Sequence, residues 1–351
     1  MNHVQDALKK LVEWRELTGA EAADAMRCLM AGEATQAQIG AFLTALKMKG
    51  ETVTEITAFA RTMREFAANI RPKVDGNLVD TCGTGGDLVK TFNVSTAAMF
   101  VAAGAGVPIA KHGNRSVTSK AGSADVIEAL GAKVDLPPED VQRCIEKIGI
   151  GFMFAPKFHE AMKYAAPVRR EMGVRTVFNI LGPLTNPAGA QAQVLGVYDA
   201  GLTENLANVL RNLGSKRAMV VHGLDGLDEI STIGKTQISE LKDEEVRTYT
   251  VAPEDFGITR TNADEIAGKD AVENAKMLLK VLRGEHGARR GIVLLNAAAA
   301  IVVGGKAGDL REGMTAAANA IDAGRAFEKV VKLIEATGGD VGKLRELEAS
   351  L

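Results

Sequence analysis

The sequence predicts an α/β protein: a small all-helical N-terminal domain plus a larger α/β domain whose mostly parallel central sheet is covered by helices. Two observations lead to this fold class. Apolar residues recur at helical spacing through residues 1–70, where no strand pattern occurs. From Asn77 onward, short apolar strands alternate with helical segments, a pattern typical of βαβ units and a parallel sheet.

The N-terminal block contains four apolar-periodic segments, each of which we expect to be a helix. They are VQDALKKLVEW, AADAMRCLMAG, TQAQIGAFLTALKMKG and VTEITAFARTMREFAANI. Pro72 closes the block, because proline lacks the N–H that a continuing helix needs.

The rest of the chain carries the predicted sheet. We expect strands at 78–82, 107–113, 150–155, 193–198, 217–223 and within 238–251. We expect helices at 94–106, 123–134, 139–149, 271–283 and 289–303. Because strands and helices alternate, the helices should cover both faces of the sheet.

One segment interrupts this alternation. Residues 168–190 contain Pro183 and Pro187 among polar turns. We expect this excursion to leave the sheet, pack against the N-terminal helices and return. The helical domain would then comprise residues 1–70 joined by 168–190, and the α/β domain residues 71–167 and 191–351.

Composition excludes several classes of protein. The 351 residues are enough for two domains, and their net charge of −2, with both signs dispersed, argues against a general nucleic-acid binder. Cys28, Cys82 and Cys144 are far apart and form no C-x-x-C pair, as in a protein with free thiols in a reducing cytosol. The N-terminus lacks signal-peptide character and no apolar run is long enough to span a membrane, so we expect a cytoplasmic protein without membrane contact.

A glycine-rich loop follows the first predicted strand. Gly83, Gly85 and Gly86 come directly after LVDTC, where glycine lets backbone N–H groups approach a ligand. The dinucleotide fingerprint fails because its third glycine would fall on Leu88, and no G-K-S/T sequence follows to complete a Walker A loop. Asp87 puts a carboxylate beside the expected phosphate, which points to a bridging cation.

Three further features narrow the ligand. NVST supplies Asn93, Ser95 and Thr96 at a helix start, and KHGNRSVTSKAGSAD supplies many donors after the next strand. Carboxyl ends of adjacent parallel strands meet at one sheet edge, so these clusters would form a polyphosphate site. Asp228 and Glu229, after the strand RAMVVHG, are suited to Mg²⁺. Helix capping, a solvated basic loop and surface acids remain the alternative interpretations of these features.

Taken together, the motifs resemble anthranilate phosphoribosyltransferase over nearly the whole chain. CGTGGD, NVST, KHGNRSVTSKAGSAD, VRREMGVRTVFNILGPLTNP and VHGLDGLDEIS stand in that family's order and spacing. GTGGD and KHGNR are also shared with pyrimidine nucleoside phosphorylases, whereas NILGPLTNP and LDE favour the anthranilate enzyme.

The resemblance implies a reaction and its setting. The family transfers the phosphoribosyl group of 5-phosphoribosyl-1-pyrophosphate (PRPP) to the amine of anthranilate, giving N-(5-phosphoribosyl)anthranilate and pyrophosphate in tryptophan biosynthesis. The implied cofactor is Mg²⁺, as two ions of which one bridges the PRPP pyrophosphate. The resemblance also implies an active site in the cleft between the domains and a homodimer formed through the helical domain.

The resemblance assigns individual residues as well. The PRPP-binding residues would be Gly83, Thr84, Gly85, Gly86, Asp87, Thr91, Asn93, Ser95, Thr96, Lys111 and Ser123. The metal residues would be Asp87, Ser95, Asp228 and Glu229. The anthranilate residues would be Gly83, His112, Asn114, His159, Arg169, Gly182 and Pro183, with Arg169 meeting the carboxylate. Lys111 and His112 would be catalytic, Lys111 through the pyrophosphate.

Elementary chemistry agrees with this assignment. Ribosyl transfer from pyrophosphate passes through a cation-like ribose, so catalysis consists of positioning and of stabilising the leaving charge. An arylamine is already neutral near neutral pH, which explains why the sequence shows no Ser-His-Asp set and no obvious nucleophile. His112 would either accept the amine proton or only orient the substrate.

Three other functions fit the same architecture. A pyrimidine nucleoside phosphorylase would use phosphate and a nucleoside in place of PRPP and anthranilate. A non-catalytic, nucleic-acid-binding homologue is the second alternative, although the near-zero net charge and the intact acid pair argue against it. The third is the same phosphoribosyl transfer onto a different aromatic acid.

Overall fold

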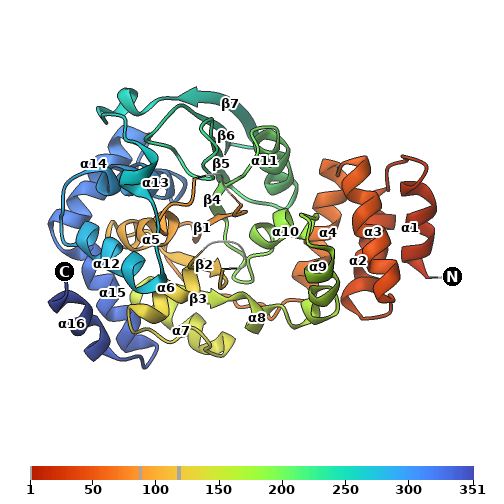
Figure 1. Ribbon diagram of the computed structural model, residues 1–351, viewed down its shortest axis with the longest axis horizontal. Coiled ribbons are helices and arrows are strands. Elements are labelled where there is room, and N and C mark those ends of the chain that lie inside the picture. The colour runs from red at the N-terminus through yellow and green to blue at the C-terminus, as the bar shows by residue number, and fades with distance from the viewer. Residues whose placement is uncertain (1, 87–88, 117–119) are drawn as a thin grey trace.

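The chain forms a helical block and an α/β body that follow one another along the longest axis of the molecule (Figure 1). The structure is a computed structural model that describes residues 2–86, 89–116 and 120–351. Asp87, predicted above to bind PRPP and metal, lies outside the described residues.

The helical block begins with helices whose starts follow from local sequence. They are α1 (His3–Leu11), α2 (Gly19–Met30), α3 (Gln36–Lys49) and α4 (Val53–Glu65). Asn2, Thr18, Thr35 and Thr52 precede them, and each cap exchanges hydrogen bonds with a Gln or Glu three residues later. Each such cap stabilises its helix by about 1 kcal/mol. The capping residues therefore determine where each helix begins.

The block packs around an apolar core with one buried ion pair. Phe42 and Phe59 meet edge to face, with 5.9 Å between their ring centroids. Glu55 is fully buried, pairs with Lys49 at 3.0 Å and accepts the backbone N–H of Leu17 at 2.9 Å. These partners offset the cost of burying the carboxylate and tie the α1–α2 turn to α4.

The α/β body is built on a sheet of order β3-β2-β1-β4-β5-β6-β7. The strands are β1 (Val79–Gly83), β2 (Ile109–Gly113), β3 (Ile150–Phe154), β4 (Ala192–Gly196), β5 (Arg217–Gly223), β6 (Thr236–Lys242) and β7 (Glu245–Val251). β1 to β5 pair in parallel, whereas β6 pairs antiparallel with both β5 and β7. The predicted fold class is thereby confirmed, and the strand pattern at 238–251 is a hairpin that turns at Asp243 and Glu244.

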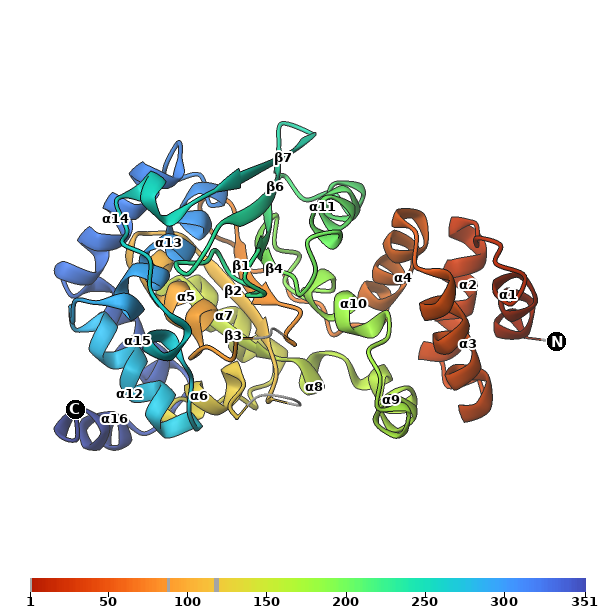
Figure 2. The same cartoon turned by 45° about the horizontal axis from the view of Figure 1, so that its top comes forward.

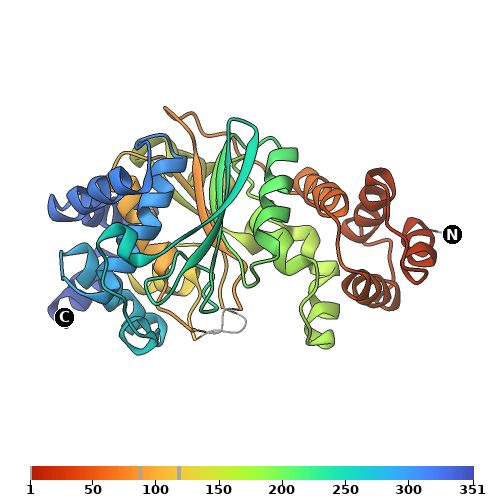
Figure 3. The ribbon, with the colours of Figure 1, turned by 90° about the horizontal axis from the view of Figure 1, so that it is seen from above.

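Helices cover both faces of this sheet (Figure 3). One face is covered by α5 (Val94–Gly104), α6 (Ser123–Ala129), α12 (Ala271–Leu282), α13 (Ala288–Val303), α14 (Leu310–Asp322) and α15 (Arg325–Ala336), followed by α16 (Val341–Ala349). The other face carries α7 (Pro138–Ile148) and α11 (Leu202–Asn212). Met219 and Val221 of β5 face the α13 side, and Ala218 and Val220 face α11, as strand alternation requires.

Two expectations about helices were incomplete. The helix predicted at 123–134 ends at Ala129, because Gly131 adopts φ +105° and turns the chain out of the helix. The predicted set also omits α11, α14, α15 and α16, and short 3₁₀ turns occur at Pro253–Phe256 and Ala263–Ile266.

After β3 the chain leaves the sheet for the helical block. It forms α8 (Ala155–Phe158), a 3₁₀ turn (Glu160–Tyr164), α9 (Ala166–Met172) and α10 (Phe178–Leu184) before it returns to β4. Val168 and Leu181 are buried in the same apolar cluster as Phe42 and Phe59. Figure 2 shows α9 and α10 between the sheet and helices α1–α4. The division of the chain into two domains at the boundaries given above stays a prediction.

Candidate active site

A cavity of about 400 Å³ lies where the carboxyl ends of the central strands face the excursion. Its walls come from the loops after β1, β2 and β5, the start of α5, and the α9–α10 segment. The predicted site residues that line it are Gly83, Thr84, Gly85, Gly86, Thr91, Asn93, Ser95, Thr96, Lys111, His112, Asn114, Ser123, Arg169, Asp228 and Glu229. His159, Gly182 and Pro183 do not line it.

The glycine loop is anchored to the strand ends that surround it. The N–H of Thr84 donates to the Gly196 carbonyl at 2.9 Å, and the N–H of Gly85 donates to Asp228 Oδ2 at 3.0 Å. A Cβ on Gly83 would lie 2.5 Å from the same carboxylate oxygen. Glycine at this position therefore lets Asp228 approach the loop backbone.

The start of α5 offers donors to the cavity. Asn93 forms no side-chain cap on the helix; its amide instead donates to the Ala121 carbonyl at 3.2 Å and accepts from Asn274 at 3.0 Å. Thr96 Oγ1 is buried without a hydrogen-bond partner among the described residues. The Ser95 N–H is already accepted by Glu229, so the unsatisfied Thr96 hydroxyl is the group at this helix start that is suited to an anion such as a phosphate.

The two acids after β5 join the glycine loop to α5. Asp228 accepts the Gly85 N–H, and Glu229 Oε1 accepts the Ser95 N–H at 3.1 Å. Burial raises the pKa of Asp228 above its usual range, and its hydrogen bond to Gly85 opposes that shift. The alternative of solvated surface acids is therefore wrong for Asp228, which is held inside the site.

The same carboxylates fit a magnesium ion. Their hard oxygen atoms face a cavity whose other walls supply phosphate-type donors. Within the described residues no three His, Cys, Asp or Glu side chains converge on one point. A Mg²⁺ ion usually takes one or two carboxylates and fills its remaining positions with phosphate oxygens and water, so this pair is sufficient.

Lys111 lines the cavity, although its side chain is almost fully buried. Its Nζ donates to the Thr81 carbonyl and, at 3.2 Å, to Ser95 Oγ. Burial lowers the pKa of this ammonium, and the nearby charge of Asp80 raises it again. In this arrangement the positive charge of Lys111 holds β1 and the start of α5 together at the edge of the cavity that it lines.

His112 and His159 form a buried pair next to the cavity. Their ring centroids are 4.9 Å apart, and both Nε2 atoms are buried without a partner among the described residues. Burial lowers the pKa of His112 to about 3 and that of His159 to about 4, although hydrogen bonds with the Gly182 and Thr185 backbones oppose this. Two neutral rings are poor proton acceptors, so the geometry favours orientation of a substrate over general-base chemistry.

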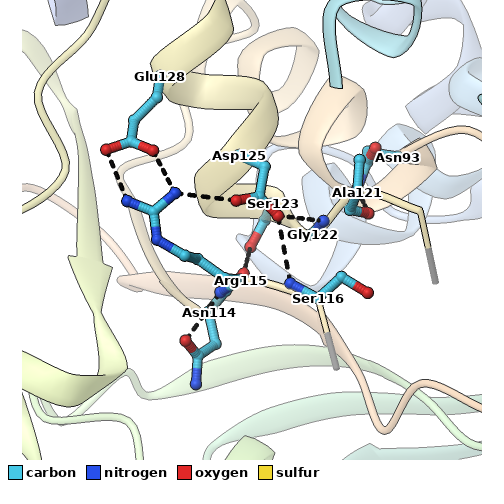
Figure 4. A network of polar contacts seen from close by, with 9 residues as sticks. All are labelled: Asn93, Asn114, Arg115, Ser116, Ala121, Gly122, Ser123, Asp125 and Glu128. Carbon is cyan, nitrogen blue, oxygen red and sulfur yellow. Dashed lines mark hydrogen bonds and ion pairs between the residues drawn. The ribbon is translucent and has the colours of Figure 1, made fainter. Parts of the chain in front are cut away.

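The loop after β2 and the start of α6 form a polar network (Figure 4). The Arg115 guanidinium contacts both oxygens of Glu128 and pairs with Asp125 at 2.9 Å. Asn114 accepts the Arg115 N–H at 2.8 Å, and Ser123 Oγ donates to the Asn114 carbonyl at 3.4 Å. Because Arg115 is bound twice by carboxylates, its charge serves the loop and is not directed at a ligand.

Arg169 lies on the opposite wall of the cavity, on α9. Its guanidinium lies over the Phe178 ring, 5.2 Å from the centroid, and burial lowers its pKa. Neither Glu160 nor Glu171 pairs with it. Among residues 2–86, 89–116 and 120–351 this stacked guanidinium has no carboxylate partner, which leaves it available to a planar carboxylate ligand.

Comparison with known proteins assigns the chain to a family. Residues 75–327 match the α/β domain of a glycosyl transferase family, and residues 5–67 match that family's helical bundle domain. The chain is 56% identical to the anthranilate phosphoribosyltransferase of Methanocorpusculum labreanum over 96% of this chain and 98% of that protein. The protein belongs to the anthranilate phosphoribosyltransferase family.

Solved structures agree with this membership, and the resemblance seen in the motifs is confirmed. The anthranilate phosphoribosyltransferase of Thermus thermophilus superposes with a TM-score of 0.89 at 41% identity, covering 95% of this chain and 99% of its own. That of Saccharomyces cerevisiae, in complex with PRPP and Mg, superposes with a TM-score of 0.87 at 28% identity, covering 95% of this chain and 98% of its own.

The motifs did not point to two residues at or next to the site, Asp80 and Arg175. Asp80 is fully buried and accepts the His112 N–H at 3.1 Å and the Asn186 amide at 2.8 Å; burial raises its pKa to about 6. An acid inside the apolar run LVDTC was the signal that could have found it. Arg175 lines the cavity from the α9–α10 segment, and nothing in its local sequence distinguishes it from its neighbours Arg169 and Arg170.

Proposed function

We infer that this protein transfers the 5-phosphoribosyl group of PRPP to the amine of anthranilate, releasing pyrophosphate. The observation that carries this inference is one cavity in which a backbone phosphate cradle and a two-carboxylate pair face an arginine on the opposite wall. The sequence identity to anthranilate phosphoribosyltransferases, 56% and 53% over nearly the whole chain, supports the same activity.

On this proposal the sheet side of the cavity binds PRPP. The glycine loop and the start of α5 would receive the pyrophosphate, with Thr96 Oγ1 as a donor that has no described partner. The Gly85 and Ser95 N–H groups would exchange Asp228 and Glu229 for phosphate oxygens. As the ribose C1–O bond breaks, negative charge develops on the leaving pyrophosphate, and these fixed donors stabilise it. No protein nucleophile is required, because the amine itself forms the new C–N bond.

The excursion side of the cavity would bind anthranilate. Arg169 is proposed to hold the carboxylate, with His112 and Asn114 lining the path of the ring. His159, Gly182 and Pro183 would act indirectly: His159 stacks on His112, Gly182 bonds to it, and the Pro183 carbonyl accepts the Gln193 amide at 2.6 Å.

Asp228 and Glu229 are proposed to hold Mg²⁺, together with Ser95 and Asp87. Bound Mg²⁺ would neutralise part of the pyrophosphate charge and so stabilise the leaving group. We propose two ions, one of which bridges the pyrophosphate. Support for the metal comes from the carboxylate pair itself and from the yeast relative that carries Mg and PRPP.

The setting of the reaction is also proposed. We place the protein in the cytoplasm, in tryptophan biosynthesis; no helix among the described residues is long and apolar enough to cross a membrane. We propose a homodimer formed through the helical block, where Trp14 and Met48 expose 64% and 66% of their surface. Sedimentation at twice the chain mass, lost on Trp14→Glu with Met48→Glu, is the expected result; a monomeric wild type would contradict it.

The reaction is tested by following anthranilate fluorescence. The fluorescence should fall only when PRPP and Mg²⁺ are both present, and a metal chelator should prevent this decrease. Phosphate-dependent cleavage of thymidine without anthranilate consumption would instead indicate the nucleoside phosphorylase alternative, which the identity to the curated relatives does not favour.

A further inference from the structure

Arg175 brings a cationic side chain from the excursion to the glycine loop. It follows α9 in the short segment that leads to α10, and it lines the same cavity as Gly85, Gly86 and Asp228. Its Nη2 donates to the Gly86 carbonyl. The guanidinium lies over the Tyr198 ring, 4.3 Å from the centroid. Such stacking holds the plane of an arginine while leaving its N–H edges available.

The loop is shaped to receive this side chain. Gly86 adopts φ +81°, and a Cβ at this position would collide with the Arg175 guanidinium. Tyr198 is itself fixed to the loop, since its N–H donates to Thr84 Oγ1 at 3.2 Å. Arg175, Tyr198 and the glycine loop therefore form one connected unit from three distant parts of the chain.

Among the described residues, the only hydrogen-bond acceptor of Arg175 is the Gly86 carbonyl, and no carboxylate forms an ion pair with it. Its charge does act at longer range on the Asp228 carboxyl, whose pKa it lowers. Two other cations at the cavity have protein partners: Arg115 is bound by Glu128 and Asp125, and Lys111 Nζ donates to Ser95 Oγ. A guanidinium has five N–H donors, so no ion pair among the described residues has to break before Arg175 binds an anion.

We propose that Arg175 binds the pyrophosphate of PRPP directly and stabilises it as it leaves, an inference that rests on the function proposed above. The guanidinium would contact two pyrophosphate oxygens from the side opposite the α5 N-terminus, while Tyr198 holds its plane. In the transfer step, the amine lone pair forms the C–N bond, the C1–O electron pair leaves with pyrophosphate, and the amine proton passes to solvent. Arg175 acts on the charge that this bond breakage places on oxygen.

The test compares Arg175→Ala and Arg175→Lys with the wild type, and uses Arg170→Ala as matched control. Arg170 is exposed on the same excursion and does not line the cavity. Binding of magnesium pyrophosphate is measured by calorimetry without anthranilate, and KM values are measured for both substrates. Arg175→Ala should weaken pyrophosphate binding and raise KM for PRPP about 10- to 100-fold. KM for anthranilate should stay unchanged, and Arg175→Lys should recover part of the loss.

Variants of Tyr198 test whether its ring positions the Arg175 guanidinium for pyrophosphate binding. Tyr198→Phe keeps the ring and should bind pyrophosphate as the wild type does, whereas Tyr198→Leu removes the platform and should weaken binding to a value between the wild type and Arg175→Ala. Wild-type pyrophosphate affinity in Arg175→Ala would overturn the proposal, even with a lower kcat or Tm, because Arg175 would then only hold the loop. A wild-type protein that neither binds pyrophosphate nor consumes anthranilate would overturn the proposed function itself.

Discussion

Three buried ionisable side chains lie on the central strands next to the site. Asp80 is buried near the start of β1, and Lys111 and His112 are buried in the second half of β2, which is also a central strand. Asp80 accepts the His112 backbone N–H, and the charge of Lys111 favours its ionised form. Burying such groups costs free energy unless partners compensate them, so their presence together indicates that the site positions charge.

The histidine pair makes stability depend on pH. Burial lowers the pKa of His159 to about 4, so between the unfolded value near 6.5 and pH 4 the unfolded chain takes up a proton that the folded chain does not. Stability contributed by the neutral ring is present above pH 6.5 and is lost as the pH falls. His159→Asn should therefore gain about 3 kcal/mol relative to the wild type between pH 7 and pH 4.

Urea unfolding at several pH values measures this difference. His286→Asn, at an exposed histidine, is the matched control. Parallel stability profiles for the wild type and His159→Asn would show that the buried ring is not kept neutral by the fold.

At the scale of elements, the loop after β5 connects two parts of the phosphate cradle. Asp228 accepts a hydrogen bond from the glycine loop, and Glu229 accepts one from the start of α5. In both bonds more than a hundred residues of sequence separate the acid from its donor. Parallel strand order explains this, because β1 lies beside β4 and β4 beside β5. The acid pair thus bridges loops that the sheet has already aligned.

We expect Asp228→Asn with Glu229→Gln to lower turnover at fixed Mg²⁺ about 100-fold or more. The amide oxygens still accept from Gly85 and Ser95, so the loop should remain folded while metal affinity is lost. Titration of initial rate against Mg²⁺ measures the effect. Asp225→Asn, in the same loop but outside the cavity lining, should retain the wild-type Mg²⁺ dependence. Unchanged metal dependence in the double variant would make the pair structural.

The sequence patterns identified the short apolar strands more reliably than the C-terminal helices. β1 to β5 are short apolar runs between turns, so each was predicted near its true bounds. The C-terminal helices α14 to α16 were not, and α6 stops early where Gly131 takes a positive φ. The site was predicted mainly from motifs, which identified most of the cavity lining but not Arg175. The buried Asp80, which supports His112 from outside the lining, was also missed, and both residues act through contacts with distant residues.

At the scale of the whole molecule, the cavity has two walls of different origin. The sheet supplies the glycine loop and the acids, and the excursion that packs against the helical block supplies Arg169. Both walls would contribute to each substrate, because Arg175 reaches the glycine loop from the excursion and His112 lines the cavity from β2. The effect of a substitution should therefore depend on the residue and not on its wall.

Arg169→Ala should raise KM for anthranilate about 10- to 100-fold and leave KM for PRPP nearly unchanged. Steady-state kinetics with each substrate varied in turn measure both values, and Arg170→Ala on the same helix is the control. The pattern is the reverse of that expected for Arg175→Ala. Equal effects on both KM values would contradict the assignment of Arg169 to anthranilate.

The sequence by itself determined the fold class, the strands, the helical N-terminal block and the motifs that mark the family, because apolar spacing and motif residues are local properties. Only the tertiary structure decided how charges are used. It showed Lys111 bonded to Ser95, Arg115 bound by Glu128, and Arg175 over Tyr198 against Gly86. Whether a charged side chain faces a ligand or a protein partner depends on neighbours that the fold brings from distant positions, and spacing along the chain does not specify them.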